Sequence, residues 1–226
     1  MQHALPAFLS VKNLTYKRKD AILFSGLSFE LWQNQCLMLT GPNGIGKSTV
    51  LEILAGLLQP TEGSLLIHGI YYGVNPSQAK RTIGFLPEQI PLFPNLTVRE
   101  YLHYIAKIRE LPRSLIKERV SSILLSFNLS HYQSCLIGQL SKGNKQRVGI
   151  AQAVLHEPSV LILDEPTDGL DEFELENFIE FLKQYKKQAA IVLATHHSSK
   201  LNPLCDQKIE LYPQGIAHHD FHHCPA

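Results

Sequence analysis

Short apolar runs recur along the chain, and their spacing predicts strands that alternate with helices. Three runs, Cys36–Thr40, Val160–Asp164 and Ala190–Thr195, are nearly continuous, as expected of parallel strands that are buried on both faces. Elsewhere apolar and polar positions alternate, which is typical of strands with one covered face. This weaker pattern predicts four further strands, over residues 8–15, 27–31, 65–68 and 82–86.

The middle of the chain has a different pattern, in which apolar residues recur at helical spacing. It predicts helices over Val98–Arg109 and Ile116–Phe127, and a third helix that begins near Lys142. A further helix around Glu172–Lys187 separates two of the buried strands. Strands that return after a block of helices indicate an α/β core with a helical insertion.

We therefore expect one domain over residues 1–226, with its core at 1–93 and 157–226 and the helical insertion at about 94–156. The apolar fraction of 44% and the charged fraction of 18% are ordinary for a globular protein, which argues against a disordered chain.

The charge balance changes the picture little. The chain has 21 Lys and Arg residues against 20 Asp and Glu, so it has no electrostatic footprint for nucleic acid. The short basic runs at 17–19 and 186–187 are interpreted as solvated surface. No apolar run approaches the roughly 20 residues that span a bilayer, and residues 1–10 do not resemble a signal peptide. The four scattered cysteines are expected to be reduced thiols, as in a cytosolic protein.

The first candidate site is a glycine loop. Gly41–Ser48 fits the pattern G-x-x-x-x-G-K-[ST], between the predicted strand Cys36–Thr40 and a helix expected over Val50–Leu58 and stopped by Pro60. Glycines allow successive backbone N–H groups to face a polyphosphate, and the helix N-terminus adds partial positive charge. The predicted nucleotide contacts are Gly41, Pro42, Asn43, Gly44, Ile45, Gly46, Lys47, Ser48 and Thr49.

The second candidate site is a pair of carboxylates. Asp164 and Glu165 follow a buried strand at its C-terminal end, where ligands bind in open α/β sheets. We expect Asp164, with Ser48, to hold Mg²⁺, and Glu165 to orient or deprotonate an attacking water. Lys47 is expected to reach the β- and γ-phosphates, which makes it the third catalytic candidate beside Glu165 and His196.

Taken together, these stretches resemble the ATP-binding domain of ABC transporters over nearly the whole chain. Leu140–Arg147 stands where that family has its signature motif, and Pro166–Asp171 resembles its D-loop. His196 resembles the switch histidine after the next strand, and Tyr16 the aromatic residue that stacks on adenine.

The resemblance implies a P-loop NTPase core, with a RecA-like parallel sheet, a small antiparallel β part and a helical subdomain. It implies ATP and Mg²⁺ as ligands and a site shared between two subunits. Ser141, Gly143, Asn144 and the D-loop residue Asp171 would act across that interface. The implied partners are a second copy of the chain or another ABC cassette, together with integral membrane permease subunits, on the inner face of the cell membrane.

Several positions depart from the family pattern or allow two interpretations. Lys142 replaces the first glycine of the signature, and Asn144 replaces its glutamine. The Q-loop position falls on Glu88, which we expect to be a metal ligand, although a shift of one residue would bring in Gln89. Alternative readings for four further residues are also open. Tyr16 could be a core residue, Asp168 and Asp171 could be helix caps, and His197 is interpreted as surface.

The sequence says less about the end of the chain and about the substrate that such a transporter would move. His218–Cys224 has ligands at spacings that could grip a metal, but a mobile tail is the favoured interpretation. Leu23–Phe29 resembles haem-exporter cassettes, whereas Leu86–Glu88 and the signature look more like drug- and polysaccharide-exporting ones. The motifs lean toward export. The alternative function is a soluble ABC-type ATPase that acts on a ribosome or nucleic acid.

Overall fold

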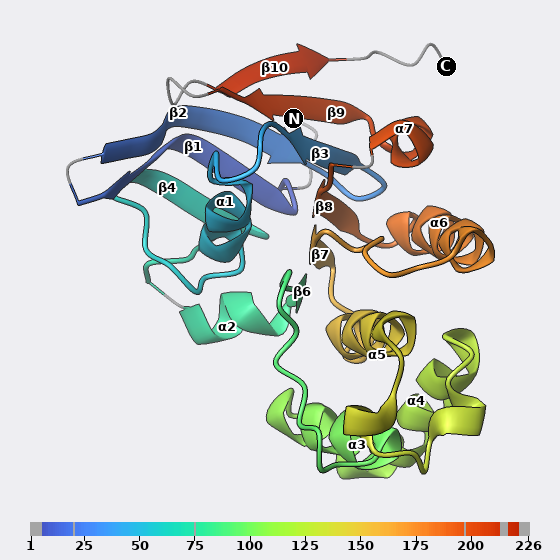
Figure 1. The fold of residues 1–226 in the computed structure, drawn as a ribbon. Helices are drawn as coiled ribbons and strands as arrows, with labels where there is room; N and C mark the ends of the chain where they lie inside the picture. Colours follow the sequence, from blue (N-terminus) through green and yellow to red (C-terminus); the bar gives the residue numbers. More distant parts are fainter. Residues whose placement is uncertain (1–5, 20, 75, 197, 213–216, 222–226) are drawn as a thin grey trace.

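Figure 1 shows the computed structural model, which describes residues 6–19, 21–74, 76–196, 198–212 and 217–221. The strands are β1 (Leu9–Arg18), β2 (Ala21–Leu31), β3 (Cys36–Thr40), β4 (Glu62–Ile67), β5 (Ile70–Tyr71), β6 (Ile83–Leu86), β7 (Val160–Asp164), β8 (Ala190–Ala194), β9 (Gln207–Leu211) and β10 (Ala217–Phe221). The α-helices are α1 (Lys47–Leu54), α2 (Pro76–Arg81), α3 (Val98–Ile108), α4 (Arg113–Ser126), α5 (Lys142–Val154), α6 (Glu172–Lys186) and α7 (Ser198–Leu201). Short 3₁₀ turns occupy Ser130–Tyr132, Ile137–Gln139 and Asn202–Leu204.

The strands form two sheets. The smaller one is antiparallel, with the order β2-β1-β4-β5. The larger one has the order β10-β9-β3-β8-β7-β6 and is parallel except for β10, which runs against β9. Helix α1 lies between the two sheets in Figure 1, while α5 and α6 lie on the other side of the parallel sheet. This is the P-loop NTPase fold, so the predicted fold class is confirmed.

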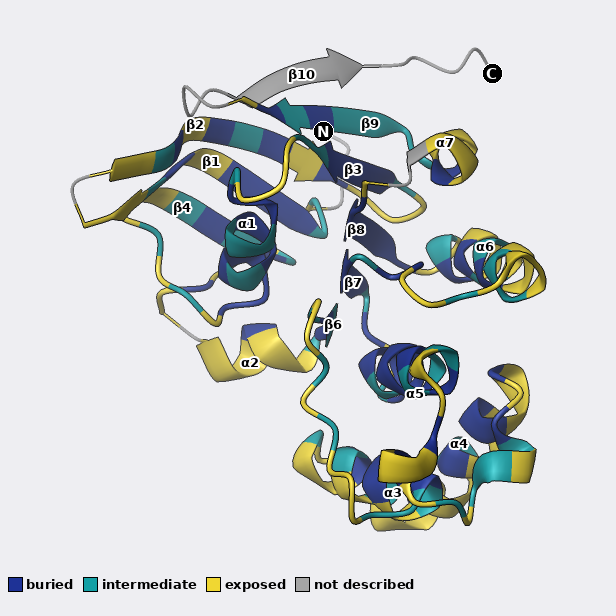
Figure 2. Ribbon diagram, in the orientation of Figure 1, coloured by how far each residue is buried: buried dark blue, intermediate teal, exposed yellow. Residues whose placement is uncertain are grey.

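The central strands divide their side chains between two hydrophobic cores. In β7, Val160 and Ile162 pack with α1 and the antiparallel sheet, while Leu161 and Leu163 pack with α5 and the helical part. The period of two in a strand sends successive side chains to opposite faces, which is why these strands are apolar at nearly every position. Figure 2 shows β3, β7 and β8 as buried and the peripheral helix α2 as largely exposed.

The helical part consists of α3 and α4, which lie beyond α5 and away from both sheets in Figure 1. Its N-terminal end is well defined, because Thr97 and Glu100 form a capping box at the start of α3. The apolar faces of α3 and α4 join the core beneath α5. The predicted insertion at about 94–156 includes α5 as well as α3 and α4. It contacts the rest of the protein mainly through α5.

Two details of the sequence prediction are wrong. Helix α1 begins at Lys47 and ends at Leu54, earlier than expected, and Gly56 rather than Pro60 follows its end. Gly56 has φ 71°, and a Cβ there would lie 1.9 Å from the Tyr72 hydroxyl, so glycine is required. The second error concerns the interpretation of residues 218–224 as a mobile tail, which is wrong for residues 218–221 because Ala217–Phe221 form β10 and pair with β9. Residues 222–226, with the rest of the proposed metal ligands, lie outside the described residues.

Within the described residues, every helix is too short or too polar to cross a lipid bilayer.

Candidate nucleotide site

The glycine loop connects β3 to α1 and leads its backbone into a tight turn. Gly41 has φ 141°, and a Cβ at this position would lie 2.6 Å from the Leu211 carbonyl oxygen. Gly44 has φ 77°, a conformation that L side chains rarely adopt. Strand β9 therefore approaches the loop so closely that only glycine fits at its start.

Lys47 is held over this loop. Its ammonium group donates hydrogen bonds to the carbonyl oxygens of Gly41 (2.9 Å) and Pro42 (3.2 Å), and the residue is only 6% exposed. A buried lysine needs hydrogen-bond acceptors to remain charged. The loop carbonyls provide them, so the positive charge is already positioned where phosphates would bind.

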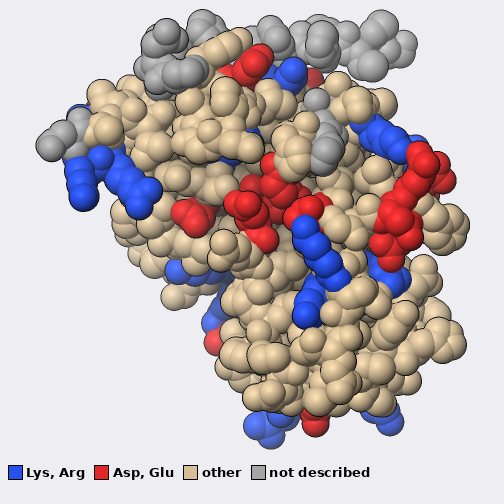
Figure 3. Space-filling model, in the orientation of Figure 1, with Lys and Arg blue, Asp and Glu red and all other residues tan. Residues whose placement is uncertain are grey.

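A cavity of about 450 Å³ opens beside the loop. Its lining residues are Arg18, Leu23, Asn43, Gly44, Gly46, Lys47, Ser48, Thr49, Glu88, Asp164, Glu165, Asp168 and His196. The structure thus brings together the catalytic and metal-binding candidates and most of the glycine loop. Figure 3 shows acidic side chains gathered near the centre of this face, with basic side chains directly beside them.

Asp164 is the most perturbed carboxyl group of the cavity. It ends β7 and is 3% exposed. Burial, together with the nearby Glu88 and Glu165 carboxylates, raises the pKa of Asp164 to about 6, although the Ser48 hydroxyl and Lys47 act to lower it. Crowded carboxylates with a hydroxyl group form a hard oxygen environment, which suits a divalent cation such as Mg²⁺.

The metal-ligand candidates fit this cation but do not enclose it. No group of three or more His, Cys, Asp or Glu side chains in the described part of the chain is arranged to hold a metal by itself. A Mg²⁺ ion at Ser48, Asp164 and Glu88 would therefore need phosphate or water oxygens to complete its shell, as is usual for Mg²⁺.

Glu165 and His196 form the reactive pair. The Glu165 carboxylate lies 2.9 Å from His196 Nδ1 and accepts a hydrogen bond from the His196 backbone N–H at 3.2 Å. Glu165 has φ 44°, a left-handed conformation that is uncommon outside glycine. This turn directs the carboxylate away from Asp164 and toward the end of β8.

Gln146 holds the backbone of this turn, and the sequence analysis missed its contribution. Its buried side-chain amide donates hydrogen bonds to the carbonyl oxygens of Glu165 (3.2 Å) and Pro166 (3.1 Å). Since Gln146 belongs to α5, the signature helix is tied directly to the catalytic turn of the same chain.

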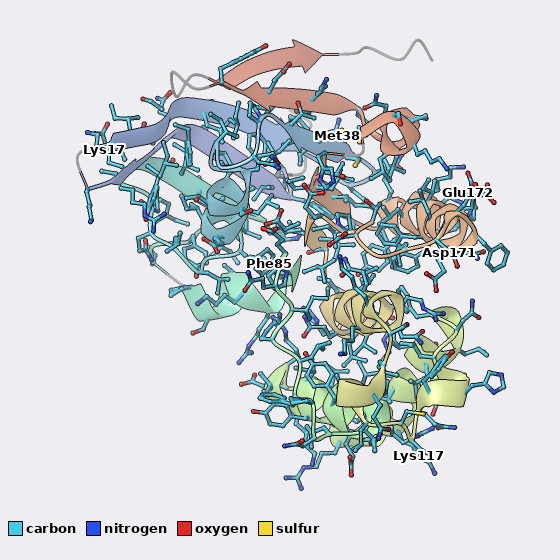
Figure 4. The ribbon with its side chains drawn as sticks, viewed as in Figure 1. Lys17, Met38, Phe85, Lys117, Asp171 and Glu172 are labelled. Atoms are coloured by element: carbon cyan, nitrogen blue, oxygen red, sulfur yellow. The ribbon has the colours of Figure 1, made fainter. Side chains whose placement is uncertain are left out.

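Glu88 and Gln89 lie in different cavities. Glu88 lines the phosphate cavity, whereas Gln89 lines a separate one with Phe85 and Arg109. The geometry favours Glu88 for the metal role. Figure 4 shows Phe85 on β6, the strand that leads to both residues.

The signature residues lie outside the cavity of their own chain. Ser141 caps α5 by accepting a hydrogen bond from the Asn144 N–H at 3.2 Å. The Asn144 side chain is buried and accepts a hydrogen bond from Arg147. Gly143 packs so tightly that a Cβ would lie 2.8 Å from the Gly169 carbonyl oxygen.

The D-loop acids have separate surroundings. Asp171 caps α6, where it accepts a hydrogen bond from the Glu174 N–H at 2.8 Å, so the helix-cap reading describes its place in one chain. Figure 4 shows Asp171 and Glu172 at the first turn of α6. Asp168 lines the phosphate cavity and forms an ion pair with Lys142. His197 lies outside the described residues.

Tyr16 does not line the cavity. It is half-buried and packs against Phe24, with ring centroids 6.4 Å apart. Arg18, further along β1, and Leu23, in β2, line the cavity instead. Arg18 is exposed, in agreement with the interpretation of residues 17–19 as solvated surface, and it also lines this cavity. The adenine contact of Tyr16 and the remaining loop contacts of Pro42 and Ile45 stay predictions.

A glycine loop between a buried strand and a helix, with paired carboxylates at the end of a neighbouring strand, defines a P-loop nucleotide-binding domain. A family model described as ABC transporter matches residues 24–168, which is more than half of the chain. The protein belongs to the ABC transporter family of ATP-binding domains.

Curated relatives extend this similarity over most of the chain. The chain is 34% identical to an uncharacterized ABC transporter ATP-binding protein, YxlF of Bacillus subtilis, over 89% of this chain and 66% of that one. It is 32% identical to the linearmycin resistance ATP-binding protein LnrL of Bacillus subtilis, over 92% of this chain and 67% of that one. It is 35% identical to a spermidine/putrescine import ATP-binding protein, PotA of Acetivibrio thermocellus, over 88% of this chain and 56% of that one. The chain thus spans roughly two thirds or less of the length of these relatives.

Solved structures agree with the fold. An ATP-binding subunit of an ABC transporter superposes with a TM-score of 0.87 at 30% identity, over 95% of this chain and 90% of that one. A dimeric ATP-binding cassette in a post-hydrolysis state, bound to ADP and Pi, superposes with a TM-score of 0.84 at 26% identity, over 94% of this chain and 98% of that one.

Proposed function

We propose that the protein binds ATP with Mg²⁺ and hydrolyses it to ADP and phosphate. The glycine loop and Lys47 hold the phosphates, and Ser48, Asp164 and Glu88 hold the metal ion. Mg²⁺ would neutralise charge on the phosphate oxygens. Glu165 orients the attacking water and accepts its proton, while His196 keeps the Glu165 carboxylate in place and faces the terminal phosphate.

The observation that carries this proposal is the 2.9 Å contact between Glu165 and His196 at the wall of a cavity that also contains Lys47. A carboxylate for the water, a histidine to hold it and a buried ammonium group for the phosphates are the parts that hydrolysis needs. A purely regulatory nucleotide binder would not need the first two.

The Glu165→Gln variant tests the catalytic assignment. The amide keeps the size and hydrogen bonding of the side chain but cannot accept a proton from water, so turnover should fall by about 10²–10⁴-fold. ATP affinity should remain within a few-fold of the unmodified protein. Phosphate release and binding of a fluorescent ATP analogue measure the two quantities. Unchanged turnover in the assembled complex would contradict the role of Glu165.

The same proposal includes a dimer. Ser141 and the start of α5 lie outside the cavity of their own chain, so in this proposal they complete the site of a second subunit. The similarity to a cassette solved as a dimer with ADP and Pi supports this arrangement. The second subunit is another copy of this chain or a related cassette.

We further propose that the dimer energises transport through separate membrane permease subunits at the inner face of the membrane. Between β6 and α3, the turn at Gln89–Pro94 leads into an aromatic surface where Phe93 is 46% exposed and packs edge-on against Tyr104 at 5.5 Å. An exposed apolar surface beside the cavity of Gln89 is a suitable place for a permease segment. Export rests on the sequence motifs alone, because the names of the relatives include both resistance and import.

Partner capture tests the transport assignment. The Glu165→Gln protein, trapped with ATP and Mg²⁺, is recovered from its native membranes and its partners are identified by mass spectrometry. A multi-span membrane protein is the expected result, and its loss in a Phe93→Asp variant would place it on this surface. Ribosomal or nucleic-acid partners without a permease would overturn transport and leave the ATPase assignment intact.

A further inference from the structure

Two cysteine side chains meet at the end of the parallel sheet that lies away from the nucleotide cavity. Cys36 is the first residue of β3, and Cys205 lies between the 3₁₀ turn Asn202–Leu204 and β9. Their sulfur atoms are 3.5 Å apart, although the two residues are 169 positions apart in the sequence. Both are free thiols, and Cys36 is fully buried whereas Cys205 is partly exposed. The fold therefore places a shielded thiol against an accessible one.

The backbone around this pair is held in place. Asp206, the neighbour of Cys205, accepts a hydrogen bond from the Cys36 N–H at 2.7 Å, and its own N–H donates to the Cys36 carbonyl oxygen at 2.8 Å. Lys186 of α6 pairs with the Asp206 carboxylate at 2.7 Å and donates a hydrogen bond to the Leu204 carbonyl oxygen at 3.0 Å. The sulfur atoms of a disulfide lie about 2.05 Å apart, so these two must approach by about 1.5 Å. The fixed backbone leaves that approach to rotation of the two side chains.

The two thiols differ in how readily they meet an oxidant. Burial, together with the neighbouring Cys205 thiol, raises the pKa of the Cys36 thiol well above its usual value. Lys186 and Asp206 act on this pKa in opposite directions, and burial prevails. Cys36 is therefore protonated and shielded from solvent, whereas Cys205 has exposed surface on which a dissolved oxidant can act. Oxidation should start at Cys205.

We propose that Cys36 and Cys205 form a reversible oxidation site, at which hydrogen peroxide converts the two thiols into a disulfide within the chain. The Cys205 sulfur attacks the O–O bond, takes one oxygen as a sulfenic acid, and water is released. The Cys36 sulfur then attacks the Cys205 sulfur, the S–O bond breaks, and the hydroxyl group leaves as water with the Cys36 proton. Two thiols are oxidised and one peroxide becomes two waters, and a thiol reductant reverses the change.

The disulfide would fasten the start of β9 to β3 without touching the nucleotide cavity. The two strands run in parallel toward the glycine loop, where the Leu211 carbonyl oxygen lies against Gly41. A strand rises about 3.3 Å per residue, so the sulfur atoms lie on the order of 15 Å from that loop. Figure 1 shows α7 beside the start of β9, so this helix would be tied down as well. A cross-link over 169 positions strongly restricts the unfolded chain, so oxidation should stabilise the fold.

The first test counts free thiols in a chain carrying Cys135→Ser and Cys224→Ser, which leaves only the proposed pair. The folded protein is treated with hydrogen peroxide, unfolded in N-ethylmaleimide and weighed by mass spectrometry. We expect a mass lower by two hydrogen atoms and no maleimide, and treatment with dithiothreitol before labelling should restore two labels. Maleimide on either cysteine after the peroxide treatment, a sulfinic acid at Cys205, or a disulfide between two chains would overturn the proposal.

A matched control keeps two partly exposed thiols but removes the pair. Cys36→Ser with Cys224→Ser leaves Cys205 and Cys135, which lies next to the start of α3. This chain should form no internal disulfide, and Cys205 should accumulate as a sulfenic acid that dimedone labels, because the thiol that would resolve it is missing. Equal dimedone labelling of Cys205 in this chain and in the chain with the pair would contradict the role of Cys36.

The second test compares the oxidised and reduced forms of the chain with the pair. Oxidation should raise Tm by about 5–10 °C, and binding of a fluorescent ATP analogue should stay within about 2-fold. Cys205→Ser should abolish the rise in Tm. An unchanged or lower Tm would overturn the stabilising role, and a 10-fold loss of ATP binding would overturn the placement away from the cavity. The inference does not depend on the proposed function, because a reduced form that fails to bind the analogue would contradict only that function.

Discussion

The glycine loop and the start of α5 are both helix N-termini suited to phosphate, yet their surroundings differ. The loop opens into a cavity that already contains Lys47, Asp164 and Glu165. Ser141, at the start of α5, is not part of the lining of that cavity, and its hydroxyl group makes a contact within the chain, the cap of α5. One chain therefore contains two separate halves of a nucleotide site. The loop half is the glycine loop with its cavity, and the signature half is the start of α5, which does not contribute to that cavity.

Gln146 connects these two halves. Its hydrogen bonds to the backbone of the catalytic turn fix α5 to the end of β7. A movement of the signature helix, which we propose to contact the nucleotide of the other subunit, would thus reach the turn that carries Glu165. Each site of a dimer would then respond to the occupancy of the other.

The largest effect is expected in the loop half, where replacing Lys47 should weaken ATP binding. Lys47→Ala removes a charge-assisted phosphate contact of about 1.5–3 kcal/mol, so ATP affinity of the single chain should fall about 10- to 100-fold. Isothermal titration with a slowly hydrolysed ATP analogue measures it. Lys117→Ala, an exposed lysine on α4, is the control. Equal affinity for both variants would count against the loop.

A change in the signature half should affect ATP-driven dimerisation and leave the ATP affinity of the single chain unchanged. Ser141→Asp keeps a good N-cap for α5, so stability should remain within about 0.5 kcal/mol. The added carboxylate would repel a phosphate, so ATP-driven dimerisation should weaken about 10-fold or more while ATP affinity of the single chain does not change. Thermal unfolding, titration and light scattering measure the three quantities. A loss of affinity in the single chain would show that Ser141 acts within its own cavity.

Replacing Gln146, which links the two halves, should have a smaller effect than replacing Lys47 or Ser141. Gln146→Leu has a similar shape but leaves the carbonyl oxygens of Glu165 and Pro166 without their donor, which should lower the free energy of unfolding by about 1–2 kcal/mol. Turnover should fall more than ATP affinity, because the catalytic turn loses its support. Urea unfolding and steady-state kinetics check both. If the variant is as stable and as active as the unmodified protein, the connection through Gln146 is unimportant.

An effect of similar size is expected at Asp164, where it depends on pH. Its pKa of about 6 lies above the value near 4 of an unfolded chain, so the folded state binds the proton more tightly between these pH values. Stability of the protein without nucleotide or Mg²⁺ should therefore fall as pH rises from 4 to 6. Asp164→Asn cannot ionise, so it should be more stable than the unmodified protein by about 1–2 kcal/mol above pH 6 and equal below pH 4. Urea unfolding across this pH range with EDTA measures the difference, and a less stable variant at pH 7 would contradict the assignment.

The sequence predicted the features that follow from strong local patterns. The bounds of β3 and β7 agree with the apolar runs, because a strand buried on both faces has no polar interruption. In contrast, α2 buries only Ala79, and β9 buries only Ile209 and Leu211, so neither has a clear pattern. Their places are set by tertiary contacts, such as the pairing of β9 with β3.

The site was predictable where chemistry is local and unpredictable where it depends on packing. The glycine spacing and the paired acids predicted residues that the structure brings to one cavity. Arg18 and Leu23 line the cavity because the β1–β2 hairpin lies beside the loop, whereas Tyr16 packs against Phe24, its partner across the two strands.

The most direct test of a half-complete site is the mass of the Glu165→Gln protein in solution, measured by light scattering with and without ATP and Mg²⁺. A single-chain mass without ATP and twice that mass with ATP are predicted, with Lys47→Ala remaining a single chain under both conditions. A protein that binds ATP at full affinity but remains a single chain at every ATP concentration would contradict the account.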